Sequence, residues 1–324
     1  MHNIHTSLLS WYKKYGRHDL PWRNSEDIYH VYLSEVMLQQ TQVKRVWDEY
    51  YFPFLEKFPS LEILAKAPIE EVFAQWSGLG YYRRAKNLHE SAKLCAPILP
   101  RTVAALMRLP GVGKYTAHAI MSFGYKESVS VVDTNIARVL TRFFALVNPS
   151  EAELWSCADG FLNHTHSTDH NLALMDLGSM VCLPKNPTCE SCPLQEECKG
   201  KDRLEAFTKT KKTIYTEQTL YFAIYTKDGK IAMQRKSDGM YKDMLTLPAL
   251  EEPLGESFIG SFKHAVTRYK LQINLYKCTH LEEDDLVWIE SENASKQAIS
   301  SMTQKALMML KLEENKGQIC NKLS

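Results

Sequence analysis

The sequence has almost no net charge, because 39 lysines and arginines oppose 38 aspartates and glutamates in 324 residues. Dividing the chain does not reveal a basic half: residues 1–205 carry 22 basic and 23 acidic side chains, and the remainder carries 17 and 15. This balance excludes a protein that binds nucleic acid nonspecifically through an extended positive surface. Any affinity for DNA must come from local patches and backbone amides.

The sequence also lacks a long apolar run, so we expect no segment that spans a membrane. Its first residues, MHNIHTSLLSWYKKYGRH, have neither the apolar core nor the cleavage site of a secretory leader. We therefore expect a soluble protein of the reducing cytoplasm, where disulfides are rare. At 44% apolar composition the chain can bury one or two cores.

The pattern of apolar residues changes along the chain. Residues 1–205 form a series of amphipathic segments separated by prolines and glycines, which predicts an all-α domain. Residues 206–216 lose this periodicity and gain lysine, as expected of a linker. The runs that follow predict a separate α+β domain over residues 217–324: YFAIYT, KIAMQR, LTLPAL and LQINLYKC.

Four of the eight cysteines, Cys182, Cys189, Cys192 and Cys198, are spaced C-x6-C-x2-C-x5-C. Such a density of thiols indicates one metal site. Zinc ribbons usually show two C-x2-C pairs, whereas a single pair flanked by two lone cysteines favours a [4Fe-4S] cluster. A zinc site and a pair of disulfides are the alternatives, and a reducing compartment argues against the disulfides.

A second motif is LPGVG at residues 109–113, between two helix-forming segments. Gly111 and Gly113 permit a tight turn and a close approach of the backbone to another molecule. The helix that begins near Lys114 presents N–H groups that can hold a DNA phosphate. Taken alone, the motif is equally compatible with a simple connector between helices.

Residues 28–41 read IYHVYLSEVMLQQT, and their apolar stripe continues onto Glu35. A carboxylate on a buried stripe loses hydration, which favours its protonated form and suits a general acid. A buried glutamate paired with an arginine is the alternative. Gln39, Gln40 and Thr41 follow, either as hydrogen-bonding groups for bases or as a solvated helix end.

A second carboxylate, Asp133, lies between the strand-like VSVV and the helical NIARVLTRFF. This position suits an N-cap, in which case Asp133 is only structural. Near Glu35, it would instead complete the carboxylate pair that breaks a glycosidic bond. In such a pair one group protonates the leaving group and the other stabilises an oxocarbenium-like centre.

Together, these motifs resemble the MutY-type adenine DNA glycosylases, which are helix-hairpin-helix, iron–sulfur glycosylases related to endonuclease III. The resemblance covers residues 1–205 strongly, and the residues from 217 onward resemble the MutT-like, or Nudix-like, domain of that family more loosely. Five segments carry it: SEVMLQQTQV, GLGYYRRAKNL, LPGVGKYTAHAI, VVDTNIARVL and MDLGSMVCLPKNPTCESCPLQEEC.

This resemblance implies excision of adenine opposite 8-oxoguanine or guanine in double-stranded DNA, by a protein with a [4Fe-4S] cluster. By the same resemblance Glu35 protonates the leaving adenine, Asp133 stabilises the cationic sugar and Asn135 helps to order the site. The adenine must first leave the base stack. A monomer is the simplest expectation for such an enzyme.

The resemblance also implies residues that wedge into the duplex to flip the base. Gln40 and either Tyr81 or Tyr82 match these positions. The segment GLGYY is equally compatible with a turn followed by core aromatics.

Endonuclease III-like lyases carry a catalytic lysine two residues after the second hairpin glycine, where this sequence has Tyr115. No Schiff-base amine is therefore placed there, and the implied chemistry is hydrolytic and monofunctional. Tyr115 is expected to help position the active site. Lys114, about 100° away around the helix, is expected to face phosphate. Weak strand cleavage through another amine stays open.

Two positions depart from the family pattern. The family's D-G-N is D-T-N at residues 133–135, and a β-branched Thr134 is expected to stiffen the loop. The F-S-H loop with which the family recognises 8-oxoguanine aligns with VTR at residues 266–268. Thr267 keeps a hydroxyl, but the aromatic ring and the imidazole are lost, so we expect weaker or differently built discrimination.

Two rival functions follow from the same sequence. MutT-like folds often hydrolyse nucleoside diphosphate derivatives through an R-E-x-x-E-E helix, but no Arg-Glu pair occurs after residue 205. A lesion-recognition domain is therefore the better interpretation. The other rival is an iron–sulfur DNA-binding protein without activity, which Glu35→Gln and Asp133→Asn would separate from a glycosylase.

Overall fold

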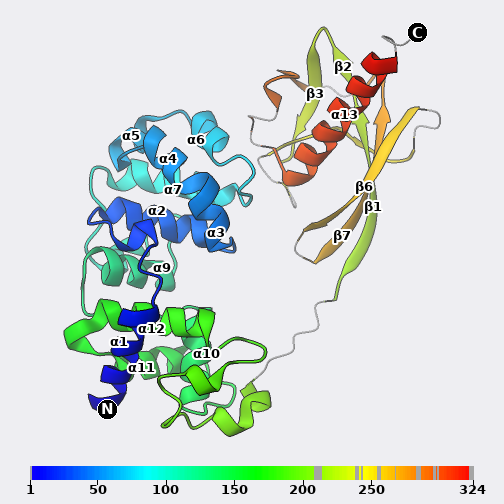
Figure 1. Cartoon of the computed structure of the whole chain (residues 1–324). Coiled ribbons are helices and arrows are strands. Elements are labelled where there is room, and N and C mark those ends of the chain that lie inside the picture. Colours follow the sequence, from blue (N-terminus) through cyan, green and yellow to red (C-terminus); the bar gives the residue numbers. More distant parts are fainter. Residues whose placement is uncertain are drawn as a thin grey trace. The chain divides into compact units, whose positions relative to one another are not determined.

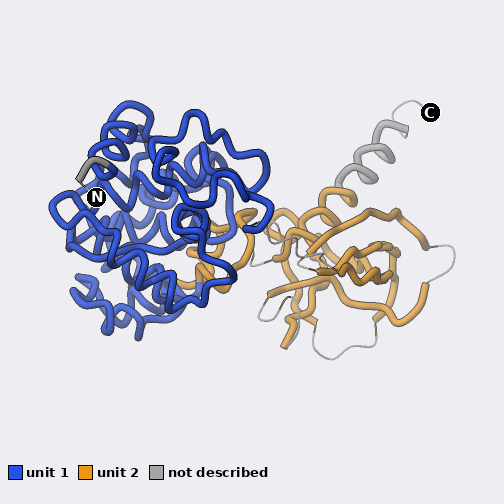
Figure 2. The backbone as a smooth tube through the Cα atoms, turned by 90° about the horizontal axis from the view of Figure 1, so that it is seen from below, with its two compact units in different colours: residues 1–67, 86–210 blue, residues 68–85, 211–324 orange. Residues whose placement is uncertain are grey.

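The computed structural model describes residues 2–207, 214–237, 241, 244–253, 257–266, 268–281, 286–294, 297 and 299–320 (Figure 1). The chain divides into two compact units, residues 1–67 with 86–210 and residues 68–85 with 211–324 (Figure 2). This division places residues 68–85 with the C-terminal unit, whereas the sequence grouped them with the N-terminal domain. The predicted linker falls mostly on residues 208–213, which lie outside the described residues.

The described part of the first unit is helical, as the sequence predicted. Two segments, η2 and η3, are π-helical, and the other η segments are short 3₁₀ turns. The helical elements are α1 His2–Tyr15, η1 Pro21–Arg23, α2 Ile28–Leu38, α3 Val43–Arg45, η2 Val46–Tyr51, α4 Phe52–Lys57, α5 Leu61–Lys66, α7 Arg83–Cys95, α8 Val103–Leu106, α9 Lys114–Ala119, η3 Ile120–Gly124, α10 Thr134–Phe143, α11 Glu151–Phe161, η4 His164–His166, α12 Ser167–Met180, η5 Cys189–Ser191 and η6 Lys201–Phe207.

Helix α2 runs through the interior of this unit. Its N-cap is Asp27, whose side chain accepts a hydrogen bond from the Tyr29 backbone N–H. Eight of its eleven residues are buried, so the helix has no solvated face. A carboxylate at Glu35 is therefore held inside the protein.

The helical hairpin consists of α8, a turn at residues 107–113, and α9. Thr102 caps α8 through a bond from the Ala105 N–H. Gly111 has a φ of 73°, and a Cβ there would lie 2.5 Å from Nδ2 of Asn87, so both backbone and space require glycine. Gly113 has an ordinary φ of −88°, and a Cβ there would meet open space, so this glycine keeps the backbone accessible.

The strand expected from VSVV is absent, and residues 129–132 form an extended loop instead. Side chains satisfy its backbone in place of a partner strand. Asn171 accepts a bond from the Val131 N–H at 3.2 Å and donates to the Val129 carbonyl at 2.8 Å. His118 Nδ1 lies 2.9 Å from the Ser130 carbonyl. This clamp fixes the segment that leads into Asp133.

The second unit contains two four-stranded sheets and a C-terminal helix. The first sheet has the order β5-β1-β7-β6, with β1 and β7 parallel, and in the second β3 pairs with β2, β4 and β8. Its elements are α6 Ile69–Gln75, β1 Thr216–Ile224, β2 Thr226–Lys227, β3 Lys230–Arg235, β4 Leu245–Thr246, β5 Ala249–Leu250, β6 Phe258–Val266, β7 Tyr269–Lys277, β8 Leu286–Glu290 and α13 Ser301–Cys320.

Helix α13 packs on one face of the first sheet (Figure 1). Met302, Ala306 and Leu307 join the sheet residues in one apolar core. A Cβ at Gly260 of β6 would lie 2.8 Å from the Met309 sulfur, so the helix and strand approach closely there. The four predicted β-rich runs are confirmed as parts of β1, β3, β4, β5 and β7. Among the described residues, no helix has the length and apolarity that crossing a bilayer needs.

Candidate active site

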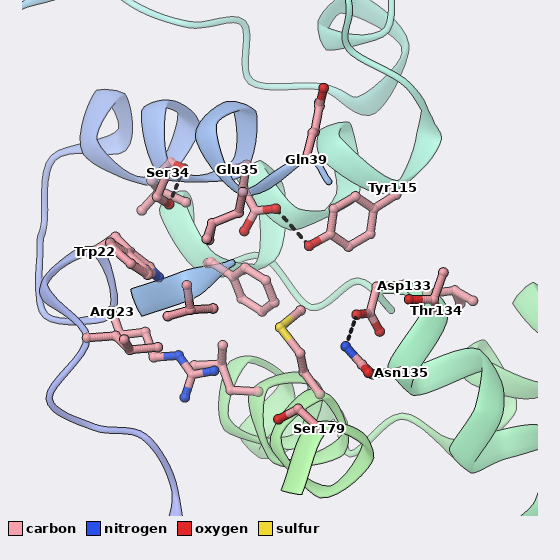
Figure 3. Close-up of a pocket in the computed structure, with 18 of the residues that line it drawn as sticks. Trp22, Arg23, Ser34, Glu35, Gln39, Tyr115, Asp133, Thr134, Asn135 and Ser179 are labelled. Atoms are coloured by element: carbon pink, nitrogen blue, oxygen red, sulfur yellow. Dashed lines mark hydrogen bonds between the residues drawn. The ribbon is translucent and has the colours of Figure 1, made fainter. Parts of the chain in front are cut away.

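A cavity of about 870 Å³ opens in the first unit between α2, the start of α9 and the start of α10 (Figure 3). This volume is ample for a nucleobase and its sugar. Glu35, Tyr115, Asp133 and Asn135 all line it, although they come from three separate segments. The predicted binding residues Gln39, Gln40 and Thr41 line it too.

Glu35 is 7% exposed and accepts a hydrogen bond at Oε2 from the Tyr115 hydroxyl at 2.7 Å (Figure 3). Burial is the main cause that raises the pKa of Glu35, and the negative charge of Asp133 adds to it. The Tyr115 bond and Arg23 oppose the rise, and the resulting pKa is about 7. A carboxyl group with this pKa is partly protonated at neutral pH and can serve as a general acid.

Asp133 combines the two roles that its sequence position allowed. It is the N-cap of α10, because Oδ1 accepts the Ile136 N–H at 2.6 Å. Its Oδ2 accepts Nδ2 of Asn135 at 2.8 Å, as Figure 3 shows. Burial raises the pKa of Asp133, and these hydrogen bonds oppose the rise. The cap therefore orients a carboxylate that also lines the cavity.

Arg138 holds the far side of Asn135. Its guanidinium donates to Oδ1 of Asn135 at 2.9 Å and to the Cys182 carbonyl at 2.7 Å. A continuous series of hydrogen bonds thus runs from Asp133 through Asn135 and Arg138 to the first cysteine of the cluster segment. No sequence pattern singles out Arg138, which reads as an ordinary polar residue of α10.

A buried ion cluster lies at the cavity wall, and no sequence motif predicted it. Asp176 of α12 accepts both guanidinium nitrogens of Arg23, at 2.7 and 2.8 Å, and Nε of Arg17 at 2.7 Å. Its side chain is fully buried. Arg23 bonds Asp176, and among the described residues Glu35 forms no salt bridge with an arginine, so the arginine-paired alternative does not describe Glu35. The one sequence signal was an aspartate inside the otherwise apolar segment of α12.

Lys114 at the start of α9 lies over an aromatic ring. Its ammonium is 4.1 Å from the ring centroid of Trp155, a residue that also lines the cavity. The His118 ring packs against the same indole at 4.5 Å. The contact fixes the lysine beside the hairpin, and its role toward phosphate stays a prediction.

The candidate wedge residues differ in accessibility. Tyr81 is 52% exposed and has a φ of 51°, an uncommon backbone for a residue other than glycine. Tyr82 is 5% exposed and packs edge-on against Phe73, as a core aromatic does. Gln40 is exposed, with a φ of 59°. Tyr81 and Gln40 therefore have the accessibility that a wedge needs, whereas Thr267 lies outside the described residues.

The four clustered cysteines line a separate cavity of about 30 Å³. None is disulfide-bonded. Arg142 points into the same place, and its guanidinium lies 3.3 Å from the Cys182 sulfur and 2.7 Å from the Leu183 carbonyl. Among the described residues, no three metal-binding side chains are grouped to hold one ion.

This donor set fits a cluster better than a single ion. Zinc needs four sulfurs about 2.3 Å from one centre, whereas a cubane distributes its thiolates over four irons. Four soft thiols and a buried guanidinium suit an anionic iron–sulfur group. The cofactor itself remains a proposal.

A family described as "HhH-GPD superfamily base excision DNA repair protein" matches residues 33–155 of the chain. The adenine DNA glycosylase of Buchnera aphidicola (subspecies Baizongia pistaciae) is 36% identical, over 76% of this chain and 73% of that protein. The human adenine DNA glycosylase is 44% identical over 61% of this chain, and the match spans only 39% of its length.

Solved structures show the same helical fold. A thermostable thymine-DNA glycosylase superposes with a TM-score of 0.58 and 30% identity, over 61% of this chain and 95% of its own. Sequence and structure comparisons therefore agree on a DNA glycosylase fold.

Proposed function

Because this chain belongs to the adenine DNA glycosylases, we propose that it removes adenine mispaired with 8-oxoguanine or guanine from double-stranded DNA. The observation that carries the proposal is the pair of the buried Glu35 and the half-buried Asp133 in one cavity, with the pKa of Glu35 raised to about 7. Two carboxylates with different environments are what cleavage of a glycosidic bond requires.

In the proposed mechanism, the flipped adenine enters the cavity and Glu35 donates its proton to a ring nitrogen of the base. Protonation makes adenine a better leaving group, and the bond from its nitrogen to the sugar breaks. Asp133 remains ionised and stabilises the resulting oxocarbenium-like sugar. Water then adds to the sugar carbon and gives up a proton to the carboxylate of Glu35, which leaves an abasic site and free adenine and restores the acid. Asn135 and Tyr115 hold the two carboxyl groups in position.

We propose a monofunctional enzyme. Tyr115 occupies the position of the lyase lysine, and its hydroxyl is engaged with Glu35. Among the described residues that line the cavity, the one lysine is Lys126. Its ammonium donates to the Phe123 carbonyl at 2.7 Å, which keeps the amine at the end of η3. The described lining of the cavity thus presents no free amine for a Schiff base with the sugar.

We assign DNA contacts to three regions of the chain. The hairpin offers the accessible backbone at Gly111 and Gly113 together with Lys114, which suits a phosphate. Gln40 and Tyr81 are the proposed wedge residues, and their strained backbones are typical of functional positions. Gln39 and Thr41 border the cavity, where they can hydrogen-bond the DNA.

We further propose that Cys182, Cys189, Cys192 and Cys198 hold a [4Fe-4S] cluster. When bound, the cluster would supply structural cross-linking and charge rather than bond cleavage. The cysteine segment would then be held in one conformation, together with Lys185, Lys199 and Lys201. Its Cys182 carbonyl anchors Arg138. We expect the protein to act as a monomer in the cytoplasm.

The test uses end-labelled duplexes with adenine opposite 8-oxoguanine, guanine or thymine, and a thymine-glycol duplex, each analysed with and without hot alkali. We expect breaks at adenine opposite 8-oxoguanine and guanine only after alkali, because an abasic site survives until it is heated in base. Cutting of the thymine-glycol duplex without alkali would move the protein to the endonuclease III class. A protein that binds but cuts none of the duplexes would be the inactive binder.

A further inference from the structure

The hairpin of β6 and β7 in the second unit ends in a group of exposed cations. Lys263 of β6 lies opposite Gln272 of β7. Lys270 comes two residues before Gln272 on β7, so its side chain is on the same face of the hairpin as Gln272 and Lys263. Lys263 and Lys270 are therefore diagonal neighbours on the face away from His264 and the core. Arg268 follows at the end of the hairpin. We call Lys263, Arg268 and Lys270 the cationic edge.

Two of these cations lie on aromatic rings. The Arg268 guanidinium is 5.4 Å from the ring centroid of Tyr269 and donates to its hydroxyl at 3.3 Å. The Lys270 ammonium is 4.7 Å from the centroid of Tyr215, which is half exposed. The Thr216 N–H bonds the Arg268 carbonyl at 2.9 Å, which ties the start of β1 to the hairpin. Such contacts reduce the freedom of both side chains before any ligand binds.

An acidic neighbour does not neutralise the cationic edge. Glu217 lies opposite Lys270 across β1 and β7, and their charged atoms are 4.0 Å apart. Both side chains are more than half exposed, at 54% for Lys270 and 80% for Glu217. An exposed pair at this distance is weak, so a phosphate can compete for the lysine.

We propose that the cationic edge binds the phosphate backbone of the DNA substrate, and that this hairpin contributes charge rather than recognition of the base. The inference rests on the proposed function, since it takes DNA as the ligand. Arginine and lysine are the side chains that bind phosphate, and their contacts fix position without reading sequence. Two of the three edge residues are lysines, which cannot stack on a purine, and the planar guanidinium of the third, Arg268, already lies on the Tyr269 ring.

This proposal predicts an effect that does not depend on the lesion. Loss of a phosphate contact weakens binding of all duplexes alike and reduces the dependence of binding on salt. Each lost contact lowers the slope of log Kd against log salt concentration by about 0.9. Loss of a base contact would instead weaken binding of one duplex only.

The experiment measures Kd by fluorescence anisotropy, from low to high salt, for the full-length protein. The duplexes carry a fluorinated deoxyadenosine that resists cleavage, opposite either 8-oxoguanine or guanine. We expect Arg268→Ala with Lys270→Ala to lower the salt slope by about 1.8 and to weaken both duplexes by the same factor. Arg268→Lys should recover most of the slope lost at that position, because it keeps the charge.

The matched control is Lys277→Ala, which removes an exposed lysine from the opposite end of β7 and should leave the slope unchanged. An unchanged slope in the double variant would overturn the proposal. A loss confined to the 8-oxoguanine duplex would also overturn it, because it would show recognition of the base. With either of these two results, excision of adenine by the wild-type protein would still support the proposed function. Only the proposal that the cationic edge binds phosphate would then be wrong.

Discussion

The first unit and residues 211–324 treat charge in opposite ways. The first unit encloses Glu35 and the cluster of Asp176 with Arg23 around its cavity. In the described part of residues 211–324, the buried polar side chains are Thr246, His264, Ser300 and Thr303, and no carboxylate is among them. The cations of that region lie at the surface instead.

This difference follows from the work that each set of charges can do. A buried carboxyl group has a shifted pKa and can exchange a proton at neutral pH, but its ionised form costs free energy of folding. A hydrated lysine keeps its charge and can attract phosphate at little cost to stability. The comparison therefore assigns the chemistry to the first unit alone, whereas both units are proposed to contact the DNA.

The largest effect that we expect is loss of excision in Glu35→Gln. A glutamine cannot donate a proton to the leaving base, so the single-turnover rate should fall about 10²- to 10⁴-fold. Binding to the A:8-oxoguanine duplex should remain. Glu151→Gln is the control, because this glutamate lines the same cavity but is exposed. A similar loss in both variants would refute the special role of the buried position.

The next effect concerns the stability of buried and exposed ion pairs. Asp176→Asn leaves Arg23 buried without its counter-charge and should lower the free energy of unfolding by about 3–5 kcal/mol. Glu290→Gln breaks the exposed pair with Lys230 in the second unit. This substitution should change the free energy of unfolding by less than about 1 kcal/mol. Urea unfolding followed by circular dichroism measures both. Equal losses would remove the contrast between the units.

A third effect is the acid sensitivity of the first unit. His170 is buried, neither ring nitrogen has a hydrogen-bond partner in the described residues, and burial lowers its pKa to about 3. The unfolded chain binds this proton below about pH 6.5 and the folded protein does not. Stability is therefore lost as pH falls, by about 1.4 kcal/mol per pH unit.

His170→Leu should remove this part of the pH dependence, so its unfolding free energy should fall less than that of the wild type between neutral and acidic pH. His166→Gln replaces an exposed histidine nearby and should keep the wild-type dependence. Urea midpoints at a series of pH values make the comparison. Parallel curves for His170→Leu and the wild type would contradict the assignment.

The smallest effect is a shift in the pH profile of excision in Tyr115→Phe. The Tyr115 hydroxyl stabilises the ionised form of Glu35, so its removal should raise the pKa of Glu35 above about 7. Excision should then persist to higher pH, by on the order of one unit. Tyr125→Phe removes a hydroxyl that bonds the Leu99 carbonyl outside the cavity and should leave the profile in place. A shift to lower pH would show that Tyr115 does not act through this bond.

Local pattern predicted much of the first unit. The apolar stripe through α2 indicated that Glu35 is buried, and the segment before α10 indicated an N-cap at Asp133. Both residues line one cavity, which no local pattern could establish. The resemblance to a known family supplied that pairing.

Other features could not be predicted because they depend on packing between distant segments. Arg23 and Asp176 are 153 positions apart, and neither has a periodic signal. The VSVV segment has β-forming residues, but Asn171 satisfies its backbone where no strand is available. Tyr81 and Tyr82 are adjacent and equivalent in sequence, and only the fold separates the exposed ring from the buried one.

The most direct test of Glu35 as the general acid is the pH dependence of single-turnover adenine excision by the wild-type protein. A general acid with the environment of Glu35 predicts a rate that falls about tenfold per pH unit above an apparent pKa near 7. In Tyr115→Phe this fall in rate should begin at a higher pH. A rate that stays constant well above pH 7 would contradict the account, because the proton would then come from a group other than Glu35.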